Sequence, residues 1–441
     1  MKYRFIGKAL FISALMLFVL STLAMAVGPQ NLTVETIAFN FDRNYPTTVT
    51  DGHDAISIRY NSDTPYFAPE YHKSNWSYPV AYIGGQENVN IIVLFKITPQ
   101  STDVSYSIRG VIRDNDIILG NTDIKEVNFQ AGRTLSSALF SIGSIPEKTL
   151  NKSYQEGWKW QYYANGVYND FDETMHTVFC LPNFPIAPWT VTGISSTNPW
   201  VEALDLACTW VKDAETVSNL TRNEIRVKQI TEGVYKWLSS IKRYPSNEDD
   251  WVNIKGVGMH HNTHDLLNRK MTEVDLTVLL TDPTTANPPL PLNFYLVECH
   301  DTSNIVSLLS SLVGITGVKI REYAGDLLDI NKIYTKGMVP IGYDETILVT
   351  NNWSDHQVVV YKDETIGGER TEKIFDPTIK LMINDEDNVP KLTVPTALDE
   401  NVYKGYLAVD KKIIYRLFNI IPVYGFTNYN VTWTIGISSF K

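Results

Sequence analysis

The feature that most limits how this chain can fold is a series of short, alternating apolar segments between residues 32 and 181. Apolar and polar positions alternate within each segment, which is the period of an antiparallel strand with one buried face. Turn-forming pairs such as Gly84-Gly85 and Asn165-Gly166 separate them. Many short strands with regular turns predict a β-sandwich, which we place at residues 27–190. The clearest segments are 55–60, 90–95, 104–109, 158–163 and 176–181.

The pattern becomes helical after Asn198-Pro199. In residues 200–211 and 222–238 the apolar positions recur every three or four residues, which favours amphipathic helices. A further helix is expected over 301–312, ended by Gly314. The remainder is expected to be strands, at 317–321, 356–361, 372–375 and several more to the end. The predicted class is α+β, an all-β sandwich followed by an α+β domain at 191–441.

The N-terminal residues 1–26 have the composition of an export signal. Lys2, Arg4 and Lys8 precede an uncharged apolar run, and Ala24-Met25-Ala26 supplies a small-x-small cleavage pattern. The apolar run is shorter than the ~20 residues that a helix needs to cross a bilayer, although an uncleaved anchor remains the alternative. We therefore expect a signal peptide, a secreted or extracytoplasmic protein (cell surface or periplasm), and no membrane span after its removal.

The net charge argues against binding to polyanions. It is −11 for the whole chain, and loss of the three positive charges of the signal makes it −14. Nucleic-acid binding depends on Lys and Arg side chains that neutralise phosphates, so no nucleic-acid partner is expected. The same balance disfavours docking on anionic lipid surfaces.

The chain has three cysteines, an odd number for an exported protein. Cys180 and Cys208 form either a disulfide or two buried thiols, and their spacing does not decide between these. If they pair, Cys299 is the remaining thiol. It lies at the expected start of the 301–312 helix, where backbone N–H groups stabilise a thiolate and can donate to an oxyanion. A small buried apolar residue is the alternative role for a cysteine there.

A nucleophilic thiol needs a base, and the base needs a group that orients it. His356 opens the strand at 356–361, and Asp376 follows the strand at 372–375. In a hairpin centred on Ile366 the two side chains lie opposite each other on one face, whereas a centre one residue later places them two positions apart. The carboxylate is expected to hold the imidazole through Nδ1–H, which leaves Nε2 for the thiol.

Residues 294–378 resemble the core of the transglutaminase-like superfamily, which uses a papain-type Cys-His-Asp triad in this chain order. The segments that carry the resemblance are Cys299-His300-Asp301, the helix ending at Leu312-Val313-Gly314-Ile315, His356 before alternating apolar residues, and Asp376-Pro377-Thr378. The resemblance implies that Cys299 is the nucleophile, His356 the general base and acid, and Asp376 the orienting carboxylate.

The resemblance further implies acyl transfer at a protein or peptide amide through a thioester. If water attacks the thioester, the protein is a cysteine protease or amidase. If an amine attacks it, the protein is a transglutaminase. The alternative is a surface binding or structural protein that keeps the fold without the chemistry. In either case the β-sandwich is expected to face a substrate or a cell-surface partner.

We expect no cofactor and no metal. His260 and His264 would share one helix face, as zinc ligands do, but no third ligand is evident near them. A polar rim of the active site is the expected role of this segment.

Overall fold

The computed structural model describes most of the chain in a set of separate ranges. They are residues 29, 31–40, 55–56, 58, 69–112, 119–146, 150–187, 189, 198–211, 220–241, 299–324, 333–341, 349–353, 355–363, 371–384, 388–407 and 414–416. The expected signal peptide at 1–26 and the histidines from His260 to His264 lie outside the described residues.

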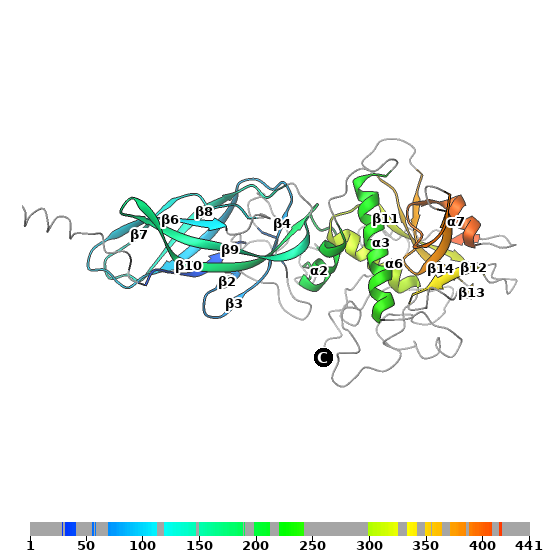
Figure 1. Cartoon of the computed structure of the whole chain (residues 1–441), viewed down its shortest axis with the longest axis horizontal. Helices are drawn as coiled ribbons and strands as arrows, with labels where there is room; N and C mark the ends of the chain where they lie inside the picture. Colours follow the sequence, from blue (N-terminus) through cyan, green and yellow to red (C-terminus); the bar gives the residue numbers. More distant parts are fainter. Residues whose placement is uncertain are drawn as a thin grey trace, which may run out of the picture.

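The N-terminal half forms two sheets of five strands (Figure 1). Its strands are β1 (Thr33–Ala38), β2 (Tyr71–His72), β3 (Trp76–Ser77), β4 (Val80–Ile83), β5 (Val89–Lys96), β6 (Val104–Ile112), β7 (Lys125–Phe129), β8 (Leu135–Gly143), β9 (Leu150–Ala164) and β10 (Val167–Leu181). The first sheet has the order β3-β2-β1-β5-β8 and the second β4-β10-β9-β6-β7. The described pairs are antiparallel except β4 with β10.

These two sheets share one apolar core. Alternate residues of β5 are buried, as the period-two pattern of the sequence predicts. Their side chains meet those of the second sheet, where Trp158 and Trp160 are fully buried. The β9–β10 hairpin closes through Asn165 and Gly166, whose φ angles of 54° and 82° are those that a tight primed turn requires.

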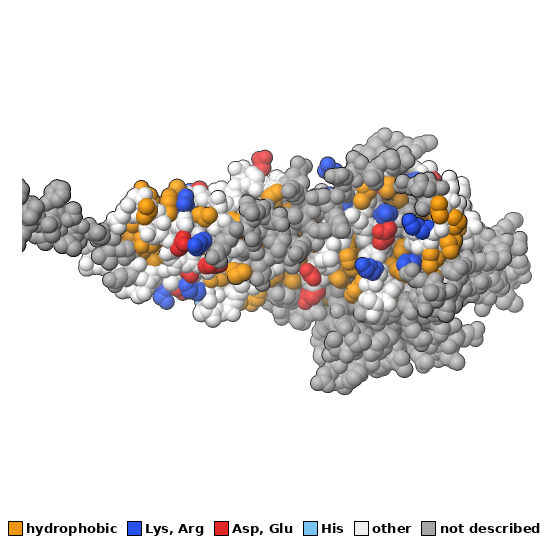
Figure 2. Space-filling view, in the orientation of Figure 1, with side chains coloured by type: hydrophobic (Ala, Val, Ile, Leu, Met, Phe, Trp, Pro, Cys, Tyr) orange, Lys and Arg blue, Asp and Glu red, His pale blue; other side chains and the backbone are white. Residues whose placement is uncertain are grey.

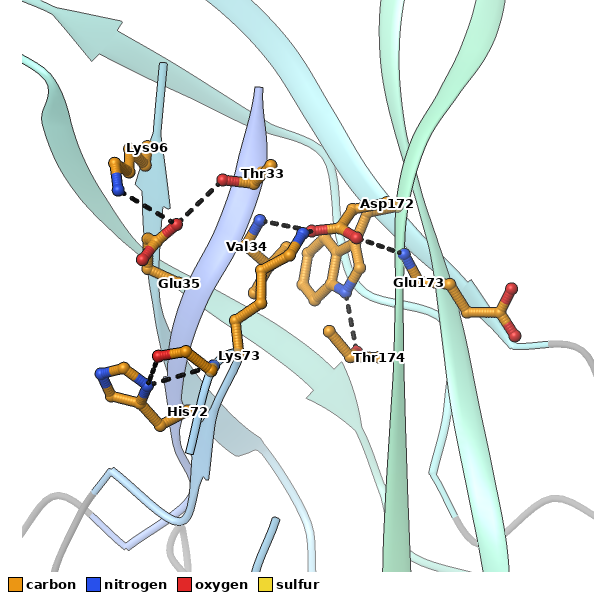
Figure 3. Close-up of polar contacts among 11 residues, drawn as sticks. Thr33, Val34, Glu35, His72, Lys73, Lys96, Asp172, Glu173 and Thr174 are labelled. Carbon is orange, nitrogen blue, oxygen red and sulfur yellow. Dashed lines mark hydrogen bonds and ion pairs between the residues drawn. The ribbon is translucent and has the colours of Figure 1, made fainter. Parts of the chain in front are cut away.

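A polar bridge joins the two sheets at one side (Figure 3). The Asp172 carboxylate on β10 accepts a hydrogen bond of 2.7 Å from the Val34 backbone N–H on β1 and forms an ion pair of 2.6 Å with Lys73. The pairing register shifts at this level in both strands, after Asp170 in β10 and after Val34 in β1. The irregularities thus coincide with the contact that ties the sheets together.

The C-terminal half contains four described helices and two further sheets (Figure 1). The helices are α2 (Val201–Trp210), α3 (Arg222–Ile241), α6 (Cys299–Leu312) and α7 (Glu400–Leu407). The strands are β11 (Val318–Ala324), β12 (Ile333–Pro340), β13 (Val349–Trp353), β14 (Asp355–Tyr361), β15 (Lys373–Phe375), β16 (Ile379–Asn384), β17 (Pro390–Thr393), β18 (Leu398–Asp399) and β19 (Ile414–Arg416). The third sheet has the order β18-β15-β14-β11-β19 and the fourth β13-β12-β16-β17.

The third sheet is covered on both faces. Val359 and Phe375 point toward α2, α3 and α6 and belong to the largest apolar cluster. Val358 and Ile374 point the other way, into a core shared with the fourth sheet and α7. Side chains alternate along a strand, so the parity of a residue number decides which of these layers it faces.

The segment that follows β10 contacts the C-terminal end of α6. The Ile186 N–H donates to the Ser311 carbonyl at 2.9 Å, and the Trp189 indole N–H donates to the Leu308 carbonyl at 2.9 Å. Gly314 ends the helix with a φ of 73°, the conformation that favours glycine. The segment that follows the N-terminal sheets is therefore bonded to the helix that begins at Cys299.

The observed class agrees with the sequence-based prediction at the coarse level. The structure is mixed α and β, with strands predominating, and α2, α3 and α6 lie where helical periodicity was found. The prediction of strands alone after the 356–375 region was wrong, because residues 400–407 form α7. Acidic, basic and apolar side chains are interspersed on the described surface in Figure 2. No helix in the described ranges has the length and apolarity needed to cross a membrane.

Candidate active site

Cys299 is the first residue of α6, two positions before the predicted start of the helix. Its side chain is buried, with 2% of its surface exposed. The first N–H groups of a helix have no partner within the helix, and they give its N-terminus a partial positive charge. The apolar side of α6, with Ile305 and Leu309, is buried in the cluster that includes Val359 and Phe375 of the third sheet.

His356 and Asp376 are joined by a buried hydrogen bond. The His356 Nε2 lies 2.8 Å from Asp376 Oδ2, and both side chains are completely buried. His356 is the second residue of β14, and Asp376 directly follows β15, the neighbouring strand. By parity both side chains face the layer formed by the fourth sheet and α7.

One of the two expected hairpin centres is observed, and the expected contact of the imidazole was wrong. Val359 pairs with Phe375, which centres the hairpin on Gly367 rather than Ile366. In that register Asp376 lies two positions from the residue opposite His356, as the alternative centre predicted. The carboxylate also contacts Nε2 and not Nδ1. Nδ1 is therefore the ring nitrogen that does not contact the carboxylate.

The Asp376 carboxylate is in contact with three hydrogen-bond donors. Its Oδ1 accepts the Thr378 backbone N–H at 2.9 Å, and its Oδ2 accepts the Tyr403 hydroxyl at 2.6 Å as well as the bond with His356. Its own N–H donates to the Pro395 carbonyl at 2.8 Å. Such a set of contacts fixes the orientation of the carboxylate.

Two contacts connect the start of α6 to the neighbours of His356 and Asp376 in the chain. The Thr302 hydroxyl donates to the Cys299 carbonyl at 3.1 Å and lies 2.8 Å from the Thr378 hydroxyl. The Ser303 hydroxyl donates to the backbone carbonyl of Gln357, the residue after His356, at 3.0 Å. The helix that carries Cys299 is thus bonded to the strand of His356 and to the turn after Asp376.

Tyr403 is a buried phenol that donates to Asp376. Burial raises the pKa of Tyr403 well above its usual value, and the charges of Asp376, Tyr323 and Cys299 raise it further. Tyr403 therefore stays protonated and acts as a donor to Asp376.

The other two cysteines lie away from these residues. Cys180 on β10 and Cys208 on α2 are buried thiols that interact electrostatically, and no disulfide joins them. Burial, and secondarily the neighbouring Cys180, raises the pKa of Cys208. Of the two alternatives left open by the sequence, the structure has the thiols. Among the described residues, no group of three or more His, Cys, Asp or Glu side chains could hold a metal ion.

Sequence reasoning did not find Tyr403, Thr302 or Thr378 as parts of this site. Thr378 follows Asp376 by two residues, so its backbone N–H could have been anticipated as a turn donor. Tyr403 gave no such signal, because its helix was not predicted.

Comparison with known protein families gave no matching family model, and comparison with curated proteins gave no similar sequence.

Proposed function

We propose that this chain is a transglutaminase-like cysteine hydrolase or acyltransferase that acts on an amide of a protein or peptide. In this proposal Cys299 is the nucleophile, His356 the general base and acid, and Asp376 the group that orients the imidazole. The N-terminal sheets would be a β-sandwich domain at 27–190, and the catalytic domain would span 191–441.

One observation carries the proposal. A buried His356–Asp376 hydrogen bond of 2.8 Å lies beside the first turn of a helix that begins with a cysteine. A carboxylate that binds one imidazole nitrogen fixes the ring and stabilises its protonated form, which leaves the other nitrogen for a nucleophile. The hydrogen bonds between Thr302 and Thr378 and between Ser303 and Gln357 hold the start of α6 against the turn after Asp376 and against β14.

The reaction would proceed through a thioester. His356 Nδ1 takes the proton of the Cys299 thiol, and the thiolate attacks the carbonyl carbon of the amide. N–H groups at the start of α6 stabilise the oxyanion of the tetrahedral intermediate. When the intermediate collapses, the C–N bond breaks and the imidazolium gives its proton to the departing amine. Water then yields a carboxylic acid, or a second amine yields a new amide, and Cys299 recovers its proton.

The test is the pH dependence of Cys299 alkylation by iodoacetamide, with mass spectrometry to locate the adduct. A cysteine paired with an imidazole reacts well below the ordinary thiol value of ~8.5. Cys299 of the wild type should therefore be alkylated at acidic pH, and His356→Ala should abolish this reaction at acidic pH. His72→Ala, which changes a partly exposed histidine on β2, is the matched control and should leave the profile unchanged.

A second candidate is a binding or structural protein that keeps this arrangement without turnover. The observation that favours it is burial, since Cys299 is 2% exposed and His356 and Asp376 are fully buried. In that case alkylation would be absent, or would rise only near ~8.5 with and without His356. Either result would replace the enzyme proposal with this one.

The remaining parts of the proposal concern location and partners. The sequence of residues 1–26 supports export, to the cell surface, the periplasm or the medium. The β-sandwich would bind the substrate or a cell-surface partner. Detection of the mature N-terminus after expression in the native host would test the export step.

A further inference from the structure

We infer that Tyr403 is a positioning residue that shares the Asp376 carboxylate with His356 and sets how strongly that carboxylate holds the imidazole. The inference deepens the proposed function, since it names a residue that would control the acid–base pair of the same site. It begins with a shared atom. Asp376 Oδ2 accepts both the Tyr403 hydroxyl at 2.6 Å and the His356 Nε2 contact at 2.8 Å.

Tyr403 is held rigidly enough for this role. Its side chain is completely buried in the core between the third and fourth sheets, with its ring 5.9 Å from that of Tyr323. Tyr323 on β11 pairs directly with His356 on β14, so the same aromatic pair lines the layer that the imidazole faces. A fixed ring keeps the hydroxyl aimed at Oδ2.

The helix of Tyr403 is fixed by a buried arginine. Arg321 on β11 forms ion pairs with Glu400, the first residue of α7, at 3.2 Å, and with Glu372 just before β15. Only 5% of the Arg321 side chain is exposed, so these charges are poorly screened. Lys404 adds a 2.9 Å pair to Glu400 along the helix. Arg321 thus ties the helix of Tyr403 to the strand that precedes Asp376.

The chemical consequence follows from charge sharing. Each hydrogen bond to a carboxylate oxygen stabilises part of its negative charge, so a second donor weakens the attraction of that oxygen for an imidazolium. The titratable groups of this site are Asp376 after β15, which contacts the imidazole, Tyr323 on β11, which pairs with His356, Tyr403 on α7, and Cys299 at the start of α6. Of these, Tyr403 is the one that touches the same oxygen as the ring.

The test is a histidine-selective NMR titration of the wild type and of Tyr403→Phe. The chain has eight histidines, and His356→Ala assigns the signal. Without the Tyr403 hydroxyl, the Asp376 carboxylate should attract the protonated His356 ring more strongly. The titration midpoint measured for His356 in Tyr403→Phe should therefore lie at higher pH than that measured in the wild type. Phenylalanine keeps the ring in the core, so the fold should survive.

Tyr406→Phe is the matched control, because Tyr406 lies on the same helix and packs against the same core. Its titration should coincide with that of the wild type. A His356 midpoint in Tyr403→Phe that is unchanged, or lower, or shifted equally in Tyr406→Phe, would overturn the inference. The NMR readout needs no turnover, so it separates this inference from the proposed function, which is judged by alkylation.

Discussion

The hydroxyl oxygens of Thr302 and Thr378 lie 2.8 Å apart in the buried region between α6 and the turn after Asp376. Thr302 uses its single proton in the bond to the Cys299 carbonyl. Thr378 must then be the donor in the contact between the two hydroxyls. The order of donation therefore runs from the turn of Asp376 to the helix of Cys299.

This direction predicts the effect of removing the Thr378 hydroxyl. Thr378→Val keeps the shape of the side chain but leaves a buried threonine oxygen without its donor, which should lower the free energy of unfolding by about 1–2 kcal/mol. Alkylation of Cys299 should also slow, because the start of α6 is less firmly tied to Asp376. Urea unfolding and alkylation rates measure the two effects.

Thr371→Val is the control for this change, since the exposed Thr371 hydroxyl makes only a 3.3 Å contact with Asp399. Its effect should stay within about 0.5 kcal/mol. Equal losses in the two variants would show that the Thr302–Thr378 contact adds nothing.

Local pattern explains why part of this fold could be predicted. The buried alternation in β5 and the apolar periodicity of α3 are properties of consecutive residues, and Gly314 marks the end of α6 by itself. His356 and Asp376 were found because they belong to adjacent strands joined by one loop. Of the two hairpin centres that the sequence left open, the structure has the one at Gly367. Both centres put the same side chains of β14 on each face, so the alternation of apolar residues alone could not choose between them.

Tyr403 could not be found in this way. Its helix has only eight residues, and Val402, beside the fully buried Tyr403, is 48% exposed. The sequence therefore has no apolar stripe that would predict a helix there. The ion pair between Arg321 and Glu400 that fixes the helix joins residues far apart in the sequence. The same holds for Thr302 and Thr378, which are separated by 76 positions.

Gly314 should be intolerant of any side chain. Its φ of 73° is unfavourable for other residues, and a Cβ would lie 2.3 Å from the Phe184 carbonyl oxygen. Backbone strain and overlap together should lower the free energy of unfolding of Gly314→Ala by about 2–5 kcal/mol. Because Phe184 belongs to the segment after β10, the damage should also loosen the N-terminal sheets from α6, which limited proteolysis would detect.

Gly405→Ala is the matched control in this case. A Cβ there meets nothing within 4 Å, and the residue lies on α7. Alanine should leave stability unchanged or raise it by up to about 1 kcal/mol, as expected inside an exposed helix turn. A loss in Gly405→Ala as large as in Gly314→Ala would contradict the steric account.

His176 should make the N-terminal sheets sensitive to acid. It is buried among Phe39, Tyr71 and Trp158, and burial lowers its pKa from 6.5 to about 3. The folded state keeps the ring neutral while the unfolded state binds a proton below about pH 6.5. Stability from this residue is therefore complete above that pH and is lost as the pH falls toward 3, by about 1.4 kcal/mol per unit.

The measurement is the free energy of unfolding between neutral pH and about pH 4 for the wild type and His176→Phe. Phenylalanine keeps an aromatic ring among Phe39, Tyr71 and Trp158 and does not titrate. The free energy of unfolding of the variant should therefore change less with pH over this range. His72→Phe should keep the wild-type slope, since His72 is only partly buried on β2. If the free energies of unfolding of the wild type and His176→Phe depended on pH in the same way, His176 would not be the cause of the acid sensitivity.

Gln357 should be a residue whose replacement stabilises the fold. It is fully buried, and neither its Oε1 nor its Nε2 has a hydrogen-bond partner within the part of the chain that the structure describes. Leucine has a similar size and no polar atoms, so Gln357→Leu should raise the free energy of unfolding by about 1–3 kcal/mol. Gln161→Leu should not, because that amide bonds to Arg109 and Asp170. Urea unfolding of both variants decides the point. A loss of stability in Gln357→Leu would instead show that the amide, one residue from His356, binds a ligand or water.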